Sequence, residues 1–108
     1  MSEHNSDMEM NAIILEAIAL NRCITASYNR MQITLAPHIL YTKHGELYVD
    51  AVTMIRDGQI PREVKLGAFK VTGLKDLTPN EQRFSRVAVY NPDDEKYSGV
   101  TLFAVALD

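Results

Sequence analysis

The sequence has one cysteine, no tryptophan and no long apolar run, and these shortages exclude several classes of protein. A single cysteine cannot form a disulfide within the chain, and it cannot supply a Cys₄ or Cys₂His₂ zinc site. No run approaches the roughly 18 apolar residues that span a bilayer. The N-terminal sequence MSEHNSDMEM is polar and acidic, unlike a signal peptide. We therefore expect a soluble, reduced, cytoplasmic protein that does not enter a membrane.

The common catalytic and cofactor-binding motifs are missing as well. The chain contains no GxSxG, GxxxxGKS/T, GxGxxG or HExxH sequence. His38 and His44 flank a predicted turn, but without further ligands nearby we expect two separate surface imidazoles, and His4 is isolated. Cys23 follows a predicted helix, where no helix dipole activates a thiol, and we expect it to be a small buried residue. The sequence thus predicts no metal, no cofactor and no enzymatic activity.

The residues that are present suit one domain with an N-terminal helix. The 108 residues are 46% hydrophobic and 23% charged, which are ordinary values for a globular protein. We expect residues 1–8 to be a flexible N-terminus and residues 9–22 to form a helix, with Ser6 and Glu9 as a capping box. The apolar residues of this helix cover a wider arc than one contact surface requires. The helix is therefore either clamped between a sheet and another element or part of a subunit interface.

After the helix, the apolar period changes to the alternation that is typical of strands. Three short polar segments each separate two such runs and predict tight turns. They are Asn29-Arg30, residues 43–46 and residues 56–59. Pro37 interrupts one run and belongs at a strand edge or a bend. Short strands near residues 63–66 and 69–77 complete a small barrel or strongly bent sheet over residues 23–77, with the helix plugging one open side.

The last third of the chain predicts a linker and a hairpin. Residues 78–82 (TPNEQ) are rich in turn formers and read as a linker. Beyond it, residues 86–90 and 100–107 are two β-type runs on either side of an acidic turn, so we expect residues 83–108 to form a C-terminal β-hairpin added to the barrel. The second run is almost wholly apolar. A strand of that kind is covered on both faces or lies at a dimer interface.

The net charge of −3 hides an uneven distribution of charge along the chain. Residues 30–75 carry seven basic and four acidic side chains, a net +3, whereas the two flanking segments each carry −3. A basic barrel can bind phosphates, and tyrosines such as Tyr28, Tyr41 and Tyr48 can stack on bases. The alternative is an ordinary mixed surface whose tyrosines lie half in the core.

Five segments between residues 12 and 77 follow one another in a recognisable order. They are Ile14–Ile18 in the helix, Ile24–Tyr28 in the first strand, the proline segment Ala36–Leu40, GELYVDA at Gly45–Ala51 and the basic REVKLGAF at Arg62–Phe69. Leu74 and Leu77 fit the apolar positions that follow. This order resembles that of the WYL domain family. The family has tryptophan, leucine, aspartate and a second arginine where this chain has Leu47, Val49, Gly67 and Ala68.

The resemblance implies a small Sm/SH3-like barrel with a non-enzymatic regulatory role. WYL domains occur in bacterial transcription regulators and defence systems, where they sense nucleotides or single-stranded nucleic acids, so this chain would be a stand-alone sensor acting on a regulator or defence partner. Its ligand site would use Tyr28 and Tyr48 for stacking or hydrogen bonding, and His38, Arg62 and Lys65 for phosphate. The alternative function is a ligand-free protein–protein interaction or dimerisation module. A homodimer is expected.

Overall fold

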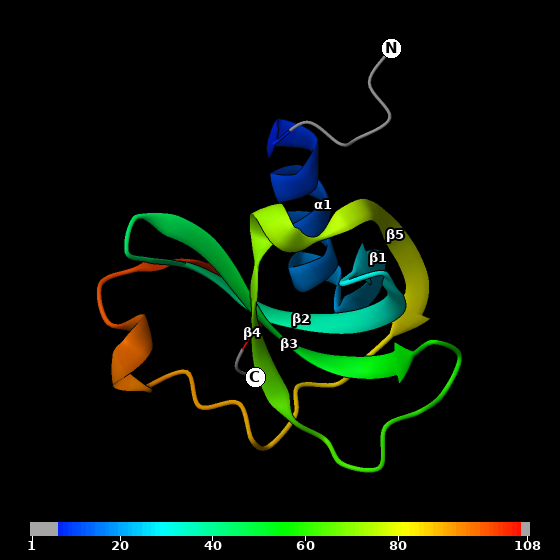
Figure 1. Cartoon of the computed structure of the whole chain (residues 1–108). Helices are drawn as coiled ribbons and strands as arrows, with labels where there is room; N and C mark the ends of the chain where they lie inside the picture. The colour runs from blue at the N-terminus through cyan, green and yellow to red at the C-terminus, as the bar shows by residue number, and fades with distance from the viewer. Residues whose placement is uncertain (1–6, 107–108) are drawn as a thin grey trace.

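One helix and six strands make up most of residues 7–106, the part of the chain that this computed structural model describes (Figure 1). In chain order the elements are α1 (Asp7–Leu20), β1 (Arg22–Tyr28), β2 (Met31–Lys43), β3 (Glu46–Arg56), β4 (Leu66–Lys70), the 3₁₀ turn η1 (Val71–Gly73), β5 (Lys75–Arg83), the 3₁₀ turn η2 (Glu95–Tyr97) and β6 (Thr101–Ala104). The predicted mainly β fold with one N-terminal helix is confirmed. The helix begins and ends two residues before its predicted bounds. Residues 1–6, with the Ser6 end of the predicted capping box, lie outside the described residues.

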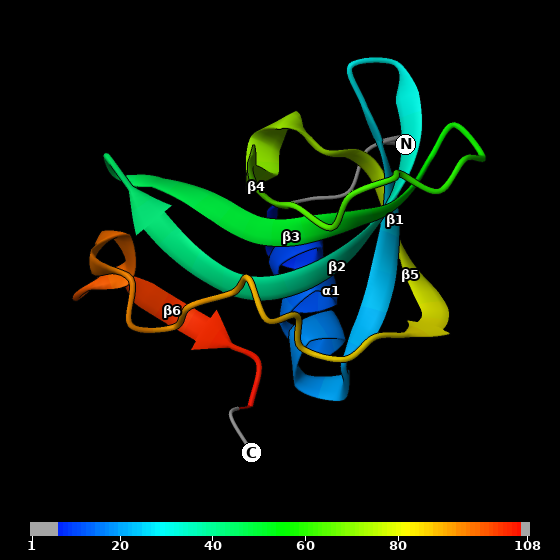
Figure 2. The same cartoon turned by 90° about the horizontal axis from the view of Figure 1, so that it is seen from below.

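The strands form one antiparallel sheet in the order β4-β3-β2-β1-β5, and β6 adds to β2. Strand β2 pairs with two different strands along one edge: with β1 up to Leu35 and with β6 from Ile39. Figure 2 shows β2 and β3 curving together as the long middle strands of the sheet. No pairing between β4 and β5 occurs within residues 7–106, so the sheet is bent but not closed.

The three predicted tight turns are confirmed, and all three have the same backbone conformation. Their central pairs are Asn29-Arg30 (φ 50° and 66°), His44-Gly45 (φ 53° and 77°) and Asp57-Gly58 (φ 47° and 80°). Two successive residues with positive φ are typical of the type I′ turn, whose twist matches that of the strands it joins. Glycine or asparagine adopts this conformation at little cost, whereas Arg30 has to adopt it with a full side chain.

Pro37 lies inside β2, at the predicted bend. The register between β2 and β3 shifts between Pro37 and Ile39, which is the mark of a β-bulge. On the other side of β2, pairing with β1 has ended at Leu35 and pairing with β6 has not begun. Proline is tolerated here because no neighbouring strand requires the N–H that it lacks.

The predicted C-terminal hairpin is not formed. Residues 86–90 are not a strand, and β6 pairs with β2 instead of folding back on them. Residues 84–100 form an extended segment, here called the strap, that runs from the end of β5 to β6 across one face of the sheet (Figure 2). The apolar residues at 86–90 do not keep the alternation of a strand, since Val87 and Tyr90 pack toward the sheet while Val89 is exposed. The Val87 N–H donates to a side chain and not to a β-ladder.

Two predicted boundaries before the strap also differ from the structure. Residues 63–65 are not a strand, since β4 begins at Leu66, and η1 interrupts the strand predicted after it. The predicted linker at residues 78–82 lies inside β5, where Pro79 is opposite Ile24. Strand β5 ends the strand order, and an edge strand tolerates proline because its outer side makes no ladder hydrogen bonds.

The sheet buries apolar side chains on both faces. The main core contains Met10, Ile14 and Ile18 of α1, which pack against apolar residues that include Ile24, Leu35 and Ile39 of the sheet and Leu74, which follows η1. A smaller cluster of Cys23, Ala36 and Val52 has Phe84 and Val87 of the strap packed against it. Cys23 is fully buried as predicted, and burial raises the pKa of its thiol. In Figure 1 α1 therefore lies above the sheet and the strap below it.

Candidate ligand groove beside β4

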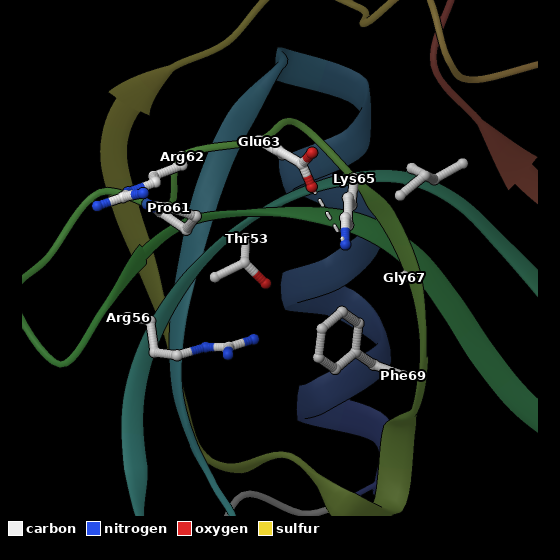
Figure 3. Close-up of a pocket in the computed structure, with 9 residues that line it drawn as sticks. Thr53, Arg56, Pro61, Arg62, Glu63, Lys65, Gly67 and Phe69 are labelled. Carbon is white, nitrogen blue, oxygen red and sulfur yellow. Dashed lines mark ion pairs between the residues drawn. The ribbon is translucent and has the colours of Figure 1, made fainter.

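An open groove with a volume of about 640 Å³ lies beside β4 (Figure 3). Its lining comes from the end of β3, from the connection between β3 and β4, and from β4 itself. The lining residues are Thr53, Arg56, Pro61, Arg62, Glu63, Lys65, Leu66, Gly67 and Phe69. The type I′ turn at Asp57-Gly58 positions this site, because it reverses the chain after Arg56 and returns the connection beside β3.

The groove is positively charged. Arg56, Arg62 and Lys65 line it, against one carboxylate, that of Glu63. Glu63 lies 3.3 Å from the Lys65 ammonium, but both side chains are largely exposed, so this ion pair is screened by water and contributes little. Figure 3 shows the charged ends of Arg56 and Lys65 directed into the space in front of Thr53, whereas Arg62 points outward from the rim. Two exposed cations, Arg56 and Lys65, thus share one space that a phosphate could enter.

An aromatic ring borders the same space. The ring of Phe69 lies 5.3 Å from that of Tyr28, edge to face at 77°, which holds the Phe69 ring in place from behind. A Cβ atom at Gly67 would lie 3.4 Å from the Phe69 ring, so the glycine keeps that edge of the ring uncovered. The groove therefore offers cations for an anion and a partly exposed ring for a flat apolar group.

The structure brings together only some of the residues predicted for the ligand site. Arg62 and Lys65 line the groove, and Tyr28 contacts it through Phe69. Tyr48 does not line it; its ring stacks 6.1 Å from Tyr41 and lies under the Lys43 ammonium at 5.5 Å. An arginine at position 68 would not reach the groove either, because Ala68 alternates with Gly67 and Phe69 along β4 and faces the other way.

His38 occupies a structural position instead of a phosphate site. Its ring is fully buried, with ring centroids of Phe84 and Tyr90 5.0 and 5.3 Å away. The Val87 N–H donates to Nε2 at 3.1 Å, so Nδ1 carries the proton and donates to the Ala36 carbonyl at 2.9 Å. Burial lowers the pKa of this imidazole; the bond to Ala36 opposes that shift, and Arg86 adds to it. Neutral His38 thus ties the strap to β2, and we leave it out of the candidate ligand site.

A buried carboxylate fixes the other end of the strap. Asp50 on β3 accepts a hydrogen bond of 2.6 Å from the Tyr41 hydroxyl on Oδ1 and one of 2.5 Å from the Tyr97 hydroxyl on Oδ2. The Lys96 ammonium lies 2.8 Å from Oδ2. Burial, together with the bonds to Asp50, raises the pKa of both phenols, so they stay protonated and keep donating. We call this group of four residues the Asp50 latch.

Sequence reasoning missed two groove residues and the latch. Arg56 had a signal, as a base next to a predicted turn, and Phe69 had one, as an aromatic residue alternating with a glycine. The latch had none, because Tyr97 is 47 positions away from Asp50 along the chain.

Within residues 7–106, no three histidine, cysteine, aspartate or glutamate side chains lie close enough together to hold a metal ion. The same residues contain no helix with the length and apolarity that crossing a membrane requires.

Comparison of the chain with protein-family models, with curated proteins and with solved structures gives no match. Function is therefore inferred from the groove and the residues around it. Chemically, the groove can pair with negative charge and stack or pack a flat ring. It contains no nucleophile next to a base, and Thr53 is the one hydroxyl side chain among its lining residues.

Proposed function

We propose that the protein is a non-enzymatic binding module that holds a nucleotide or a single-stranded nucleic acid in the groove beside β4. One observation carries the proposal: Arg56 and Lys65 direct their charged ends into the space that the Phe69 ring borders. Arginine and lysine pair with phosphate through charge-assisted hydrogen bonds. An aromatic ring stacks on any base, because every base has a π-face. The ligand class that offers both groups at a short separation is the nucleotide unit.

The proposal extends to the type of fold and the biological role. A sheet in which β5 returns to pair with β1 curls toward closure, and this supports an incompletely closed barrel of the Sm/SH3-like type. The order of sequence segments that resembles the WYL domain runs through β1 to β4 and includes the basic segment of the groove. On that basis we assign the module a regulatory role in the cytoplasm, in which ligand binding is read by a transcription or defence partner.

Fluorescence anisotropy with a labelled single-stranded oligonucleotide of about ten nucleotides tests the ligand class. Affinity should fall between about 50 and about 200 mM salt, because phosphate contacts release counterions. Arg56→Ala and Lys65→Ala should each reduce the slope of log K against log salt by about 0.7, the value for one lost contact to a single strand. Arg83→Ala, at an exposed base at the far end of β5, is the matched control and should leave both affinity and slope unchanged.

Competition with mononucleotides separates the two ligand types. Displacement at matched phosphate concentration indicates a nucleotide site, whereas resistance to displacement indicates a strand. Phe69→Leu keeps an apolar side chain but removes the stacking surface, and it should weaken binding by about 1–3 kcal/mol per stacked base. Absence of binding at both salt concentrations would refute the proposal.

A second candidate is a protein interaction or homodimerisation module without a ligand. The observation that favours it is on β6, where Leu102 and Phe103 have 55% and 38% of their surface exposed. The apolar run predicted to be covered is thus partly uncovered within one chain. Sedimentation velocity across a concentration series measures self-association, and Leu102→Lys should abolish it if β6 forms the contact.

A further inference from the structure

The outer side of α1 carries an apolar stripe. Met8, Ala12, Leu15 and Ala19 are all exposed, with 82% of Met8 and 36% of Leu15 accessible. The inner side of the helix packs into the main core, and no described element covers the outer side. Within residues 7–106, the helix is therefore not clamped between two layers. Its wide apolar arc remains without a partner.

The spacing of the stripe is that of a helix-pairing seam. The four residues follow one another at intervals of four, three and four, which is the a/d pattern of a coiled coil. Large and small side chains alternate along the seam, since Met8 and Leu15 are separated by Ala12. A facing helix could place its own large side chains over the alanines. Methionine and leucine at such a seam adapt to and fill a partner's surface.

The charges beside the stripe indicate which kind of helix fits. The charged residues of α1 are all acidic, namely Asp7, Glu9 and Glu16. Glu16 and the β5 residue Glu81 line a small hollow of about 60 Å³ beside Ile13 and Ala17 of α1, and Arg22 at the start of β1 is the one basic residue among its lining residues. A second copy of α1 on the stripe would bring acidic residues against acidic residues. A helix with basic residues at the flanks of its apolar seam would instead place them against these carboxylates.

We propose that the α1 stripe docks an amphipathic helix of another protein, one with apolar residues at a/d spacing and lysine or arginine beside Glu16 and Glu81. This goes beyond the proposed ligand function and does not depend on it. Figure 3 shows α1 on the far side of the sheet from the groove, so a helix on the stripe leaves the groove open. The module would then present ligand and partner on opposite sides.

Two synthetic peptides test the proposal on the full chain. Both have about three heptads with leucine at a and d; one has lysine at the flanking positions and the other has glutamate. In isothermal titration calorimetry at about 50 mM salt, where surface charge is little screened, the basic peptide should bind at least tenfold more tightly than the acidic one. Glu16→Lys should reduce that preference. If the peptides bound only through nonspecific apolar contact, this substitution would leave the preference unchanged.

Variants of the stripe locate the site. Leu15→Glu should weaken binding of the basic peptide at least tenfold. Ala19→Lys should weaken it to the same extent, and a lysine near the C-terminal end of a helix is favourable for the helix itself. Ile60→Glu, at an exposed isoleucine in the connection between β3 and β4, is the matched control and should leave binding unchanged. Equal binding of both peptides, binding by neither, or binding that survives Leu15→Glu would overturn the proposal. Self-association that Leu15→Glu abolishes would overturn it too, in favour of a second copy on the stripe.

Discussion

Three buried tyrosines near Asp50 allow one chemical change to be made in three different environments. Tyr41 on β2 donates to Oδ1, while Tyr97 on the strap donates to Oδ2. Tyr90 is also buried, but its hydroxyl has no hydrogen-bond partner within residues 7–106. Replacing each in turn by phenylalanine removes one hydroxyl and leaves the ring packing intact. The expected costs differ because the partners differ.

The arrangement of donors around Asp50 sets the order of the three effects. The Tyr41 hydroxyl is the one donor described for Oδ1, so Tyr41→Phe should destabilise by about 2 kcal/mol, as for a hydrogen bond to a charged group. After Tyr97→Phe, Oδ2 still has the Lys96 ammonium at 2.8 Å, and we expect a cost of about 1 kcal/mol. Tyr90→Phe removes a buried hydroxyl that makes no bond, and it should be neutral or stabilising by up to about 1 kcal/mol.

Urea unfolding followed by circular dichroism measures all three variants against the wild type at one pH. The slope with urea should stay constant, so that a shift in midpoint reports stability alone. The reasoning is refuted if Tyr97→Phe costs as much as Tyr41→Phe, or if Tyr90→Phe is the most damaging of the three. Equal costs would mean that Lys96 does not support Oδ2, and a costly Tyr90→Phe would mean that its hydroxyl has a partner.

Three further predictions follow from the turns, the buried imidazole and the groove. Because burial lowers the pKa of His38, the unfolded chain binds more protons than the folded one below about pH 6.5. The free energy of unfolding should therefore be at its full value above that pH and fall below it, by at most about 1.4 kcal/mol per pH unit. Urea unfolding between about pH 7 and about pH 5.5 measures this fall. His38→Gln should flatten this dependence, and His44→Gln, in an exposed turn, should keep it. Arg30→Gly should raise the stability by about 0.5–1 kcal/mol, because Arg30 has a φ of 66° in a type I′ turn; a lower melting temperature would contradict this. Gly67→Ala should raise the melting temperature slightly, as expected for a gain of about 0.5 kcal/mol in stability. It should also weaken binding of the oligonucleotide, because the new methyl group lies against the Phe69 ring. Unchanged affinity would argue against stacking of a base on that ring.

Local features of the sequence were enough to predict the helix, the three hairpin turns and the bend at Pro37. Each depends on residues within a few positions of one another, such as the Asp57-Gly58 pair between two alternating runs. The strap and β5 were misread because the same local pattern serves two purposes. Val87 and Tyr90 pack on the sheet without joining it while Val89 is exposed, and a polar segment with Pro79 forms an edge strand once β1 is beside it.

The candidate site was predicted in part for the same reason. Arg62 and Lys65 are close in sequence and exposed, so a charge pattern was sufficient to find them. His38 was assigned to phosphate because a histidine in a basic segment suits that role, but its partner Val87 is 49 positions away and buries it. Burial created by a distant segment cannot be seen in the residues around it.

The strap also decides how variants near the groove have to be interpreted. A second hollow of about 430 Å³ lies between the strap and residues 64–66, and both Lys65 and Lys96 line it. Lys65 lines the proposed ligand groove, whereas Lys96 is held by Asp50, so one hollow joins a residue of the proposed site to a structural one. A variant that weakens ligand binding at unchanged urea midpoint therefore identifies a groove residue. A variant that lowers both the affinity for the ligand and the urea midpoint, as Asp50→Asn should, acts by releasing the strap, which forms one wall of this hollow.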